Sequence, residues 1–306
     1  MHRLVWGAIY LSGLTALLIG TTPSRGTDPN IRSSFLSAYK QAYPKLVQNY
    51  TNIEFRYLSE APSGKGKVQL TSLEGKFDLH HYLTRWEGRV ATSDTRKTVH
   101  GIRPLISGAN KKYTFELSVD KKGQYTITEV QILPPDGRAL FFPFMAPIAD
   151  TLTDRTYLEI AEDPETEFLS LTDTEFRGLK VKELTVIVPF FSVITKDNRK
   201  AKKSYYFLPE KGWLCVGWTQ DIETEPNRYI EEYCEYETDG PYPPLKLIEM
   251  KSCDRKDPTV SELQWNIKFT KFVRLAEPLD ETEFRLSAFG FPEPLGVSWS
   301  RPTRWY

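Results

Sequence analysis

The chain has 306 residues, and its 40 Lys and Arg residues are balanced by 40 Asp and Glu residues, so the formal net charge is zero. Proteins that bind nucleic acid usually carry a basic excess on the scale of a domain, so we expect no nucleic-acid partner. Aromatic residues make up 13% of the chain, which supplies enough ring surface for a packed core and argues against disorder. Three cysteines are too few for a disulfide-based scaffold.

Residues 1–26 have the pattern of a secretory signal peptide. A short polar start precedes an uncharged, mostly apolar run over residues 4–19, and the small residues Ser24 and Gly26 lie before an expected cleavage site at Thr27. The apolar run is shorter than the roughly 20 residues that a spanning helix needs. We therefore expect cleavage, no transmembrane helix afterwards, and export to the periplasm or the extracellular space. An uncleaved membrane anchor is the alternative.

The first predicted element is an amphipathic helix over residues 31–50. Its apolar residues recur at helical spacing and form one stripe: Phe35, Leu36, Tyr39, Tyr43, Leu46, Val47 and Tyr50. Ser33 or Ser34 is the expected N-cap. Pro44 is expected to kink or break the helix, because proline removes a backbone donor and crowds the preceding turn.

After residue 50 the apolar residues alternate with polar ones, which predicts strands with one face in a core and the other toward water. Short turns between the strands favour antiparallel pairing. The predicted strands cover residues 53–57, 77–83, 113–119, 125–127, 167–174, 179–188, 204–216, 228–236, 245–250 and 263–273. The sequence therefore predicts a mainly β fold with some α structure, forming one domain over residues 27–290 with a tail over residues 291–306.

One apolar segment interrupts the strands. It contains Phe141, Phe142, Phe144, Met145, Ile148 and Leu152. Pro143 and Pro147 exclude it from the interior of a sheet, so we expect a short helical insertion, followed by another helical turn over residues 157–162. The segment is too apolar to stay exposed. We expect it to lie across the open side of a curved sheet, either as ordinary core or as a mobile lid.

Motifs for catalysis are not found. There is no Gly-x-Ser-x-Gly elbow and no glycine-rich phosphate loop. His80 and His81 would point to opposite faces of the strand predicted over residues 77–83, so we expect no metal site and no cofactor. Glu231, Glu235 and Glu237 would share one face of a strand, which is typical of a solvated sheet surface. A hydrolase that uses Glu235 or His81 is a minor alternative.

A concentrated group of basic residues lies between two predicted strands: Lys196, Arg199, Lys200, Lys202 and Lys203. The simplest interpretation is a solvated hairpin tip. The alternative is a surface that attracts anionic lipid headgroups.

The cysteines are Cys215, Cys234 and Cys253. If residues 219–227 form a hairpin loop, Cys215 and Cys234 lie nearly opposite each other, within the separation that a disulfide requires. A bridge between these two, with Cys253 apart, is one possibility, and three buried thiols are the other.

The order of elements resembles that of the outer-membrane lipoprotein carrier superfamily (LolA/LolB-like). The resemblance rests on TYLEIAEDPETEFLSLTDTEFRGLKVKELTVIV at residues 156–188, SYYFLPEKGWLCVGWTQ at 204–220 and RYIEEYCEYETDGPYPPLKLIEM at 228–250. FRLSAFGFPEP at 284–294 is similar to the closing motif of uncharacterised secreted bacterial proteins. The resemblance implies a curved, incompletely closed antiparallel sheet, or half-barrel, covered by an N-terminal helix and a short helical insertion, with a cavity for acyl chains.

From this resemblance we expect a secreted, non-enzymatic protein, monomeric, that binds a lipid, acyl chain or other apolar ligand in the concave face of the sheet. The candidate cavity and lid residues are Phe35, Tyr39, Tyr43, Phe141, Phe142, Phe144, Met145 and Ile148. The alternative is a structural or interaction module of the bacterial cell envelope with a protein partner, which the aromatic residues Trp299, Trp305 and Tyr306 in the tail favour.

Overall fold

The computed structural model describes most of the chain beyond the expected signal peptide. The described residues are 29–62, 67–92, 98–99, 105–133, 143–153, 155–192, 197–222, 225–238, 240–257 and 260–295. Several predictions therefore fall on residues outside this set: the signal peptide and its cleavage site, Phe141, Phe142, Lys196, and the tail aromatics Trp299, Trp305 and Tyr306. No helix within the described residues is both long and apolar enough to span a bilayer.

The first element is helix α1, Pro29–Tyr50. Its buried residues are Phe35, Tyr39, Leu46 and Tyr50, with spacings of four, seven and four that place them on one face. The helix starts before Ser33 and Ser34, so the expected cap is wrong. It also continues through Pro44, although a proline there removes one hydrogen bond, because the buried residues on both sides of Pro44 are held by packing.

The strands form one large antiparallel sheet and one small pair. Their bounds are β1 Ile53–Pro62, β2 Lys67–Phe77, β3 Tyr82–Thr92, β4 Thr98–Val99, β5 Leu105–Ala109, β6 Tyr113–Val119, β7 Tyr125–Ile132, β8 Ala149–Asp150, β9 Arg155–Thr156, β10 Glu167–Phe176, β11 Leu179–Ser192, β12 Asp197–Leu208, β13 Leu214–Asp221, β14 Arg228–Tyr236, β15 Leu245–Asp254 and β16 Ser261–Arg274.

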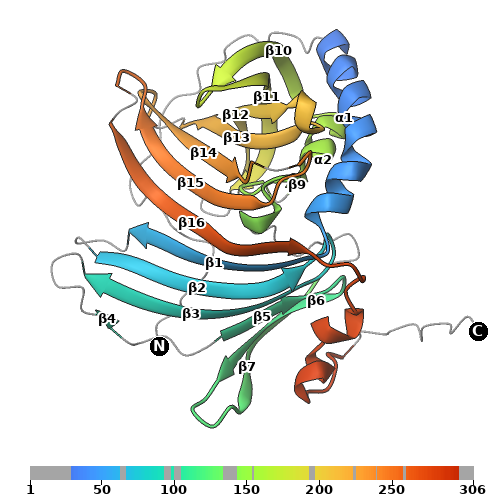
Figure 1. The fold of residues 1–306 in the computed structure, drawn as a ribbon, viewed down its shortest axis with the longest axis vertical. Helices are drawn as coiled ribbons and strands as arrows, with labels where there is room; N and C mark the ends of the chain where they lie inside the picture. The colour runs from blue at the N-terminus through green and yellow to red at the C-terminus, as the bar shows by residue number, and fades with distance from the viewer. Residues whose placement is uncertain are drawn as a thin grey trace, which may run out of the picture.

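The sheet consists of two meanders joined side by side: the first contains strands β1–β7 and the second contains strands β10–β16. The order is β10-β11-β12-β13-β14-β15-β16-β1-β2-β3-β5-β6-β7, with β4 paired to β3, so the first strand pairs with the last and the ends β10 and β7 do not meet. Register shifts, such as those at Arg56/Tyr57 and Tyr206/Phe207, bend a sheet and increase its twist. Figure 1 shows the resulting curve, with α1 along one side of strands β10–β14. The predicted fold class is confirmed: mainly β, with a large antiparallel sheet that is not closed.

Two predicted strands are each divided by a turn. The strand predicted over residues 77–83 is the turn between β2 and β3, in which Asp78 accepts hydrogen bonds from the backbone amides of His80 (2.7 Å) and His81 (2.8 Å). The strand predicted over residues 204–216 is the end of β12 and the start of β13, separated by the short 3-10 helix η2, Pro209–Lys211. Gly212 ends η2 with a φ of 66°, a conformation that glycine adopts without strain.

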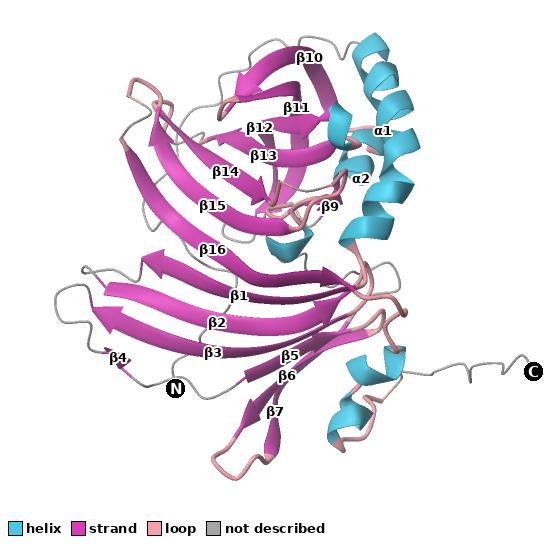
Figure 2. Ribbon diagram, in the orientation of Figure 1, coloured by secondary structure: helices cyan, strands magenta, loops and turns pink. Residues whose placement is uncertain are grey.

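The connection between the two meanders lies inside the curve of the sheet. It contains the 3-10 helix η1, Pro143–Met145, the paired strands β8 and β9, and helix α2, Tyr157–Glu162. A capping box between Thr156 and Glu159 starts α2. Figure 2 shows α2 against α1, and Arg32 of α1 donates to the carbonyl oxygens of Glu162 and Asp163 at 2.8 Å each. We call residues 143–162 the plug.

After β16 the chain packs on the other face of the sheet as two 3-10 helices, η3, Glu281–Phe284, and η4, Leu286–Phe289. Leu286, Phe289 and Phe291 pack with a second apolar cluster on β5 and β6. Glu293 accepts a hydrogen bond from the Tyr113 hydroxyl at 2.5 Å. The folded part therefore extends beyond the predicted boundary at residue 290.

Candidate functional site

The wall of the concave interior is aromatic and partly supplied by α1. Phe35 and Tyr39 are fully buried, and their rings lie 5.5 Å and 5.6 Å from the ring of Phe207 on β12. Tyr43 is half-buried, with its ring 5.8 Å from that of Tyr39. The three helix residues predicted to line a cavity are thus gathered against the meander of strands β10–β16. The hydroxyl of Tyr39 is buried and has no hydrogen-bond partner within the described residues.

The plug fills this interior with apolar side chains. Every residue from 144 to 150 is buried, and the ring of Phe144 lies 4.5 Å from Phe55 and 4.4 Å from Phe77, on strands β1 and β2. Met145 and Ile148 belong to the same core cluster. Leu152 is different, with 44% of its surface exposed. The described part of the predicted lid therefore lies inside the curve of the sheet and contacts both meanders.

A buried ion pair connects the plug to the sheet. The ε-ammonium of Lys203 on β12 donates to Asp150 Oδ2 at 2.6 Å, and the two side chains are 1% and 0% exposed. The Tyr205 hydroxyl donates to the same oxygen at 2.6 Å. The other oxygen, Oδ1, accepts the backbone amides of Leu152 (2.9 Å) and Thr153 (3.3 Å). Asp150 thus has the dense set of donors that a buried carboxylate needs.

A second carboxylate lies beside this pair. Glu232 on β14 is fully buried; its Oε1 accepts from Trp218 Nε1 at 2.8 Å, and its Oε2 accepts from Thr151 Oγ1 of the plug at 3.0 Å. The ammonium of Lys203 lies 4.3 Å from the centre of the Trp218 ring, within cation–π range. We call Asp150, Thr151, Lys203, Tyr205, Trp218 and Glu232 the buried polar cluster.

The cluster changes the ionisation of its members. Burial, together with the negative charge of Asp150, raises the pKa of Glu232 to about 7, against the hydrogen bonds from Thr151 and Trp218 and the charge of Lys203. Burial and the Asp150 carboxylate raise the pKa of Tyr205 as well, which keeps its hydroxyl a donor. Glu232 therefore holds a proton more tightly than a solvent-exposed glutamate does.

The sequence contained a signal for two of these residues that our interpretation missed. In β14, Ile230, Cys234 and Tyr236 alternate and pack on the main core, which places Glu232 on the inner face between them. In the same way Ala201, Tyr205 and Phe207 place Lys203 on the inner face of β12. The alternation of apolar residues was the usable signal, and the run of charges concealed it.

The predicted basic patch is wrong as a single surface. Lys203 points into the core, whereas the neighbouring Lys202 is exposed on the other face of β12. Lys200 is exposed and forms an ion pair with Glu167 at 2.6 Å, and Arg199 is half-buried. The described members lie within strand β12, where successive side chains alternate between faces, so they do not form one tip.

The three cysteines are free and buried, so the predicted bridge between Cys215 and Cys234 is not formed. Strands β13 and β14 pair Gly217 with Tyr233 and Trp218 with Glu232, a register that places Cys215 and Cys234 one residue out of alignment. Burial raises the pKa of Cys215 to about 12, and it also raises that of Cys234. Both groups are therefore protonated thiols at neutral pH and are unsuited to nucleophilic chemistry.

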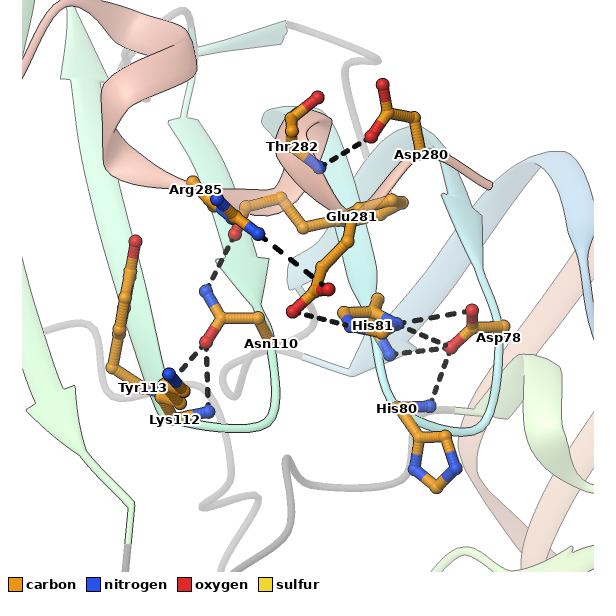
Figure 3. Close-up of polar contacts among 11 residues, drawn as sticks. Asp78, His80, His81, Asn110, Lys112, Tyr113, Asp280, Glu281, Thr282 and Arg285 are labelled. Carbon is orange, nitrogen blue, oxygen red and sulfur yellow. Dashed lines mark hydrogen bonds and ion pairs between the residues drawn. The ribbon is translucent and has the colours of Figure 1, made fainter. Parts of the chain in front are cut away.

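A second polar cluster attaches the C-terminal segment to the β2–β3 turn and to the turn between β5 and β6 (Figure 3). His81 Nδ1 lies 3.1 Å from Asp78, and His81 Nε2 lies 3.8 Å from Glu281 of η3. Asn110 donates to the carbonyl oxygen of Phe284 at 2.8 Å. Hydrogen bonds from His81 and His80 and the charge of His81 lower the pKa of Asp78, although burial opposes this. The contacts join three segments that are far apart in the sequence.

Among the described residues, hollows of about 340 and 500 Å³ open on the surface. The first is bordered by residues such as Glu183, Tyr206 and Arg255, and the second by Asp173, Lys180 and Glu210. Charged side chains border both hollows, whereas aromatic rings line the wall around the plug. In the part of the chain that the structure describes, no three metal-ligating side chains come together.

A scan against models of known protein families gave no match, and neither did a search of curated proteins. Among solved structures, the chain is similar to a porin-like protein from Bacteroides uniformis, with 7% sequence identity and a TM-score of 0.27, over 73% of this chain and 97% of that one.

Proposed function

We propose that this protein binds a ligand with a long apolar part, such as a lipid or acyl chain, inside the curve of the sheet, and that it acts by binding rather than by catalysis. The supporting observation is the way the plug is attached. Strands β8 and β9 pair with each other and not with the large sheet. The plug can therefore leave the interior without breaking a strand pair of the sheet.

The side chains that the plug covers could make apolar contacts with a ligand. Phe55 and Phe77 from the first meander, and Phe207 from the second, present their rings to the plug or to α1. A ligand that replaces the plug would recover the apolar burial that Phe144, Met145 and Ile148 now supply. A small-molecule site usually has an apolar wall and a few polar groups that point toward the ligand.

Export belongs to the same proposal. The signal-peptide pattern of residues 1–26 would deliver the protein to the periplasm or the extracellular space. A carrier or store of acyl chains is useful there, because such chains are poorly soluble in the water between membranes. N-terminal sequencing of the exported protein tests this part: a start at or near Thr27 supports it, and recovery of intact residues 1–26 contradicts it.

Binding can be tested with a fluorescent long-chain fatty acid whose emission rises in an apolar environment. We expect saturable uptake with one site per chain and displacement by an unlabelled chain. Phe55→Ala should weaken uptake, because it removes part of the proposed wall, whereas Leu58→Ala, on the exposed face of the same strand, is the matched control. Absence of saturable uptake by the unmodified protein would reject the proposal.

A second candidate function, an interaction module of the cell envelope, is favoured by strand β7. Within the described residues it lies at the end of the sheet and pairs with β6 alone, and Tyr125, Ile127, Val130 and Ile132 are each at least 36% exposed. An exposed apolar edge can accept a strand from another chain. Crosslinking in cells through a photoreactive residue at position 130 should then give one dominant protein adduct, and a diffuse set of adducts would count against this function.

A further inference from the structure

We infer that the ligand is an acyl chain that carries a carboxylate, and that the plug occupies its site by imitating it. The inference rests on the proposed function, since it specifies the head group of the apolar ligand. The plug has the same two parts as a fatty acid: a buried apolar stretch over residues 144–149, and then the carboxylate of Asp150.

The receptor for this carboxylate belongs to the sheet. Lys203 and Tyr205 project from the inner face of β12, and both donate to Asp150 Oδ2 at 2.6 Å. Lys203 is held over the Trp218 ring at 4.3 Å, and Tyr205 packs with its ring 6.4 Å from that of Phe207 on the same strand. A cation and a hydroxyl fixed in this way, and almost fully buried, form a site for one carboxylate oxygen that persists when the plug leaves.

The balance of charge favours an anionic head group over a neutral one. When the plug leaves, Asp150 moves into water, and Lys203 would remain buried without its partner, which is costly. The carboxylate of a fatty acid restores the pair, so one anion leaves as another enters and the buried charge is unchanged. An alcohol of the same chain length supplies the apolar contacts but not the carboxylate that Lys203 loses with Asp150, and Glu232, whose charged form burial disfavours, offsets the ammonium only in part. The hydrogen bond between the ligand carboxylate and the ammonium of Lys203 should therefore make the affinity for the acid higher than the affinity for the alcohol.

The decisive experiment compares hexadecanoic acid with hexadecan-1-ol as ligands, by displacement of a fluorescent probe. We expect the acid to bind the unmodified protein about 10- to 100-fold more tightly than the alcohol. Asp150→Asn should raise the affinity for both ligands by the same factor, because it weakens the competing plug without touching the receptor. The ratio of the two affinities in Asp150→Asn should equal the ratio in the unmodified protein.

The matched variant is the double substitution Asp150→Asn with Lys203→Met, which removes the cation without leaving an unpaired buried carboxylate. The acid and the alcohol should then bind about equally, whereas Asp150→Asn with Lys202→Met, which changes the exposed neighbour, should keep the full ratio. Tyr205→Phe in the Asp150→Asn background should reduce the ratio several-fold.

The outcomes distinguish a failure of the head-group inference from a failure of the proposed function. If both ligands bind but the ratio is close to one, or if it survives the loss of Lys203, the head-group inference is wrong and the apolar site stands. If neither ligand binds any of these proteins, the proposed function itself is wrong, and the head-group inference falls with it.

Discussion

The ammonium of Lys203 lies 2.6 Å from the carboxylate of Asp150, and both side chains are buried. Lys203 belongs to the sheet, and Asp150 belongs to a connection that has no strand pair with it. A buried ion pair contributes little net stability compared with apolar residues of the same size, but losing one partner is costly. The pair is therefore better understood as a specific attachment point than as a general source of stability.

This relationship predicts a strong coupling between the two residues. Lys203→Met should reduce the free energy of unfolding by about 3–5 kcal/mol, because it leaves Asp150 buried without a cation. Combining it with Asp150→Asn should restore a large part of this loss. Chemical denaturation of the single and double variants measures the coupling. Lys202→Met, at an exposed position, should change stability by no more than about 0.5 kcal/mol; additive single losses would contradict the coupling.

Glu232 predicts a dependence of stability on pH. Its pKa is about 7 in the folded protein, above the ordinary value of 4.5, so the folded state holds this proton more tightly than the unfolded state does. The resulting contribution is fully present below pH 4.5 and is lost as the pH rises to 7, by about 3 kcal/mol in total.

Glu232→Gln, which imitates the protonated form, should differ least from the unmodified protein near pH 5 and should clearly exceed its stability above pH 7. Urea denaturation between pH 5 and pH 8 measures the difference. Glu235→Gln, on the other face of the same strand, is the control, and its profile should run parallel to that of the unmodified protein. A parallel profile for Glu232→Gln would mean that the residue is ionised throughout this range.

Phe144 predicts that the plug opens separately from the sheet. Phe144→Ala creates a cavity between Phe55 and Phe77, a type of change that costs about 3–5 kcal/mol. If the plug opens as a unit, the amides of Ile148 and Tyr157 should exchange with solvent about 100-fold faster or more, while that of Trp218 is unaffected. Leu152→Ala, at an exposed position of the plug, should change neither. Equal acceleration at Trp218 would show that the plug is ordinary core.

Asp78 predicts the opposite dependence on pH for the turn between β2 and β3. Its pKa is lowered, so its contribution to stability is present above its ordinary value of 3.8 and is lost as the pH falls through the folded value. Asp78→Asn should therefore destabilise the protein at pH 7, with a difference that shrinks at strongly acidic pH. Thermal unfolding at several pH values measures it, and a difference that is constant across this range would contradict the assignment.

Much of the fold could be predicted because it depends on local periodicity. The stripe through Phe35 and Tyr39 identified α1, and the two prolines and the phenylalanines around residue 144 identified a segment that leaves the sheet and is then buried. The turn at Asp78 was missed, because Phe77, Leu79 and His81 continue the alternation of a strand by chance. In the structure the chain turns here, and the carboxylate of Asp78 accepts hydrogen bonds from two backbone amides of the turn.

The buried polar cluster could not be assembled from the sequence, because its members come from three strands and the plug. Lys203 was interpreted by its charge and not by its place between Ala201 and Tyr205. The partner of Lys203, Asp150, lies 53 residues away, and the two meet only because the plug is buried inside the curve of the sheet. The register of β13 and β14 separates Cys215 from Cys234 by one position, and the sequence did not define the centre of the hairpin loop well enough to predict this shift.

The central claim is that the plug and a carboxylate-bearing acyl chain compete for one site. The most direct measurement is hydrogen–deuterium exchange of the full chain with and without saturating hexadecanoic acid. The account predicts that the ligand removes protection from residues 143–162 and leaves strands β12, β13 and β14 protected. If the acid binds and the plug becomes more protected or does not change, the ligand lies elsewhere and the claim is wrong.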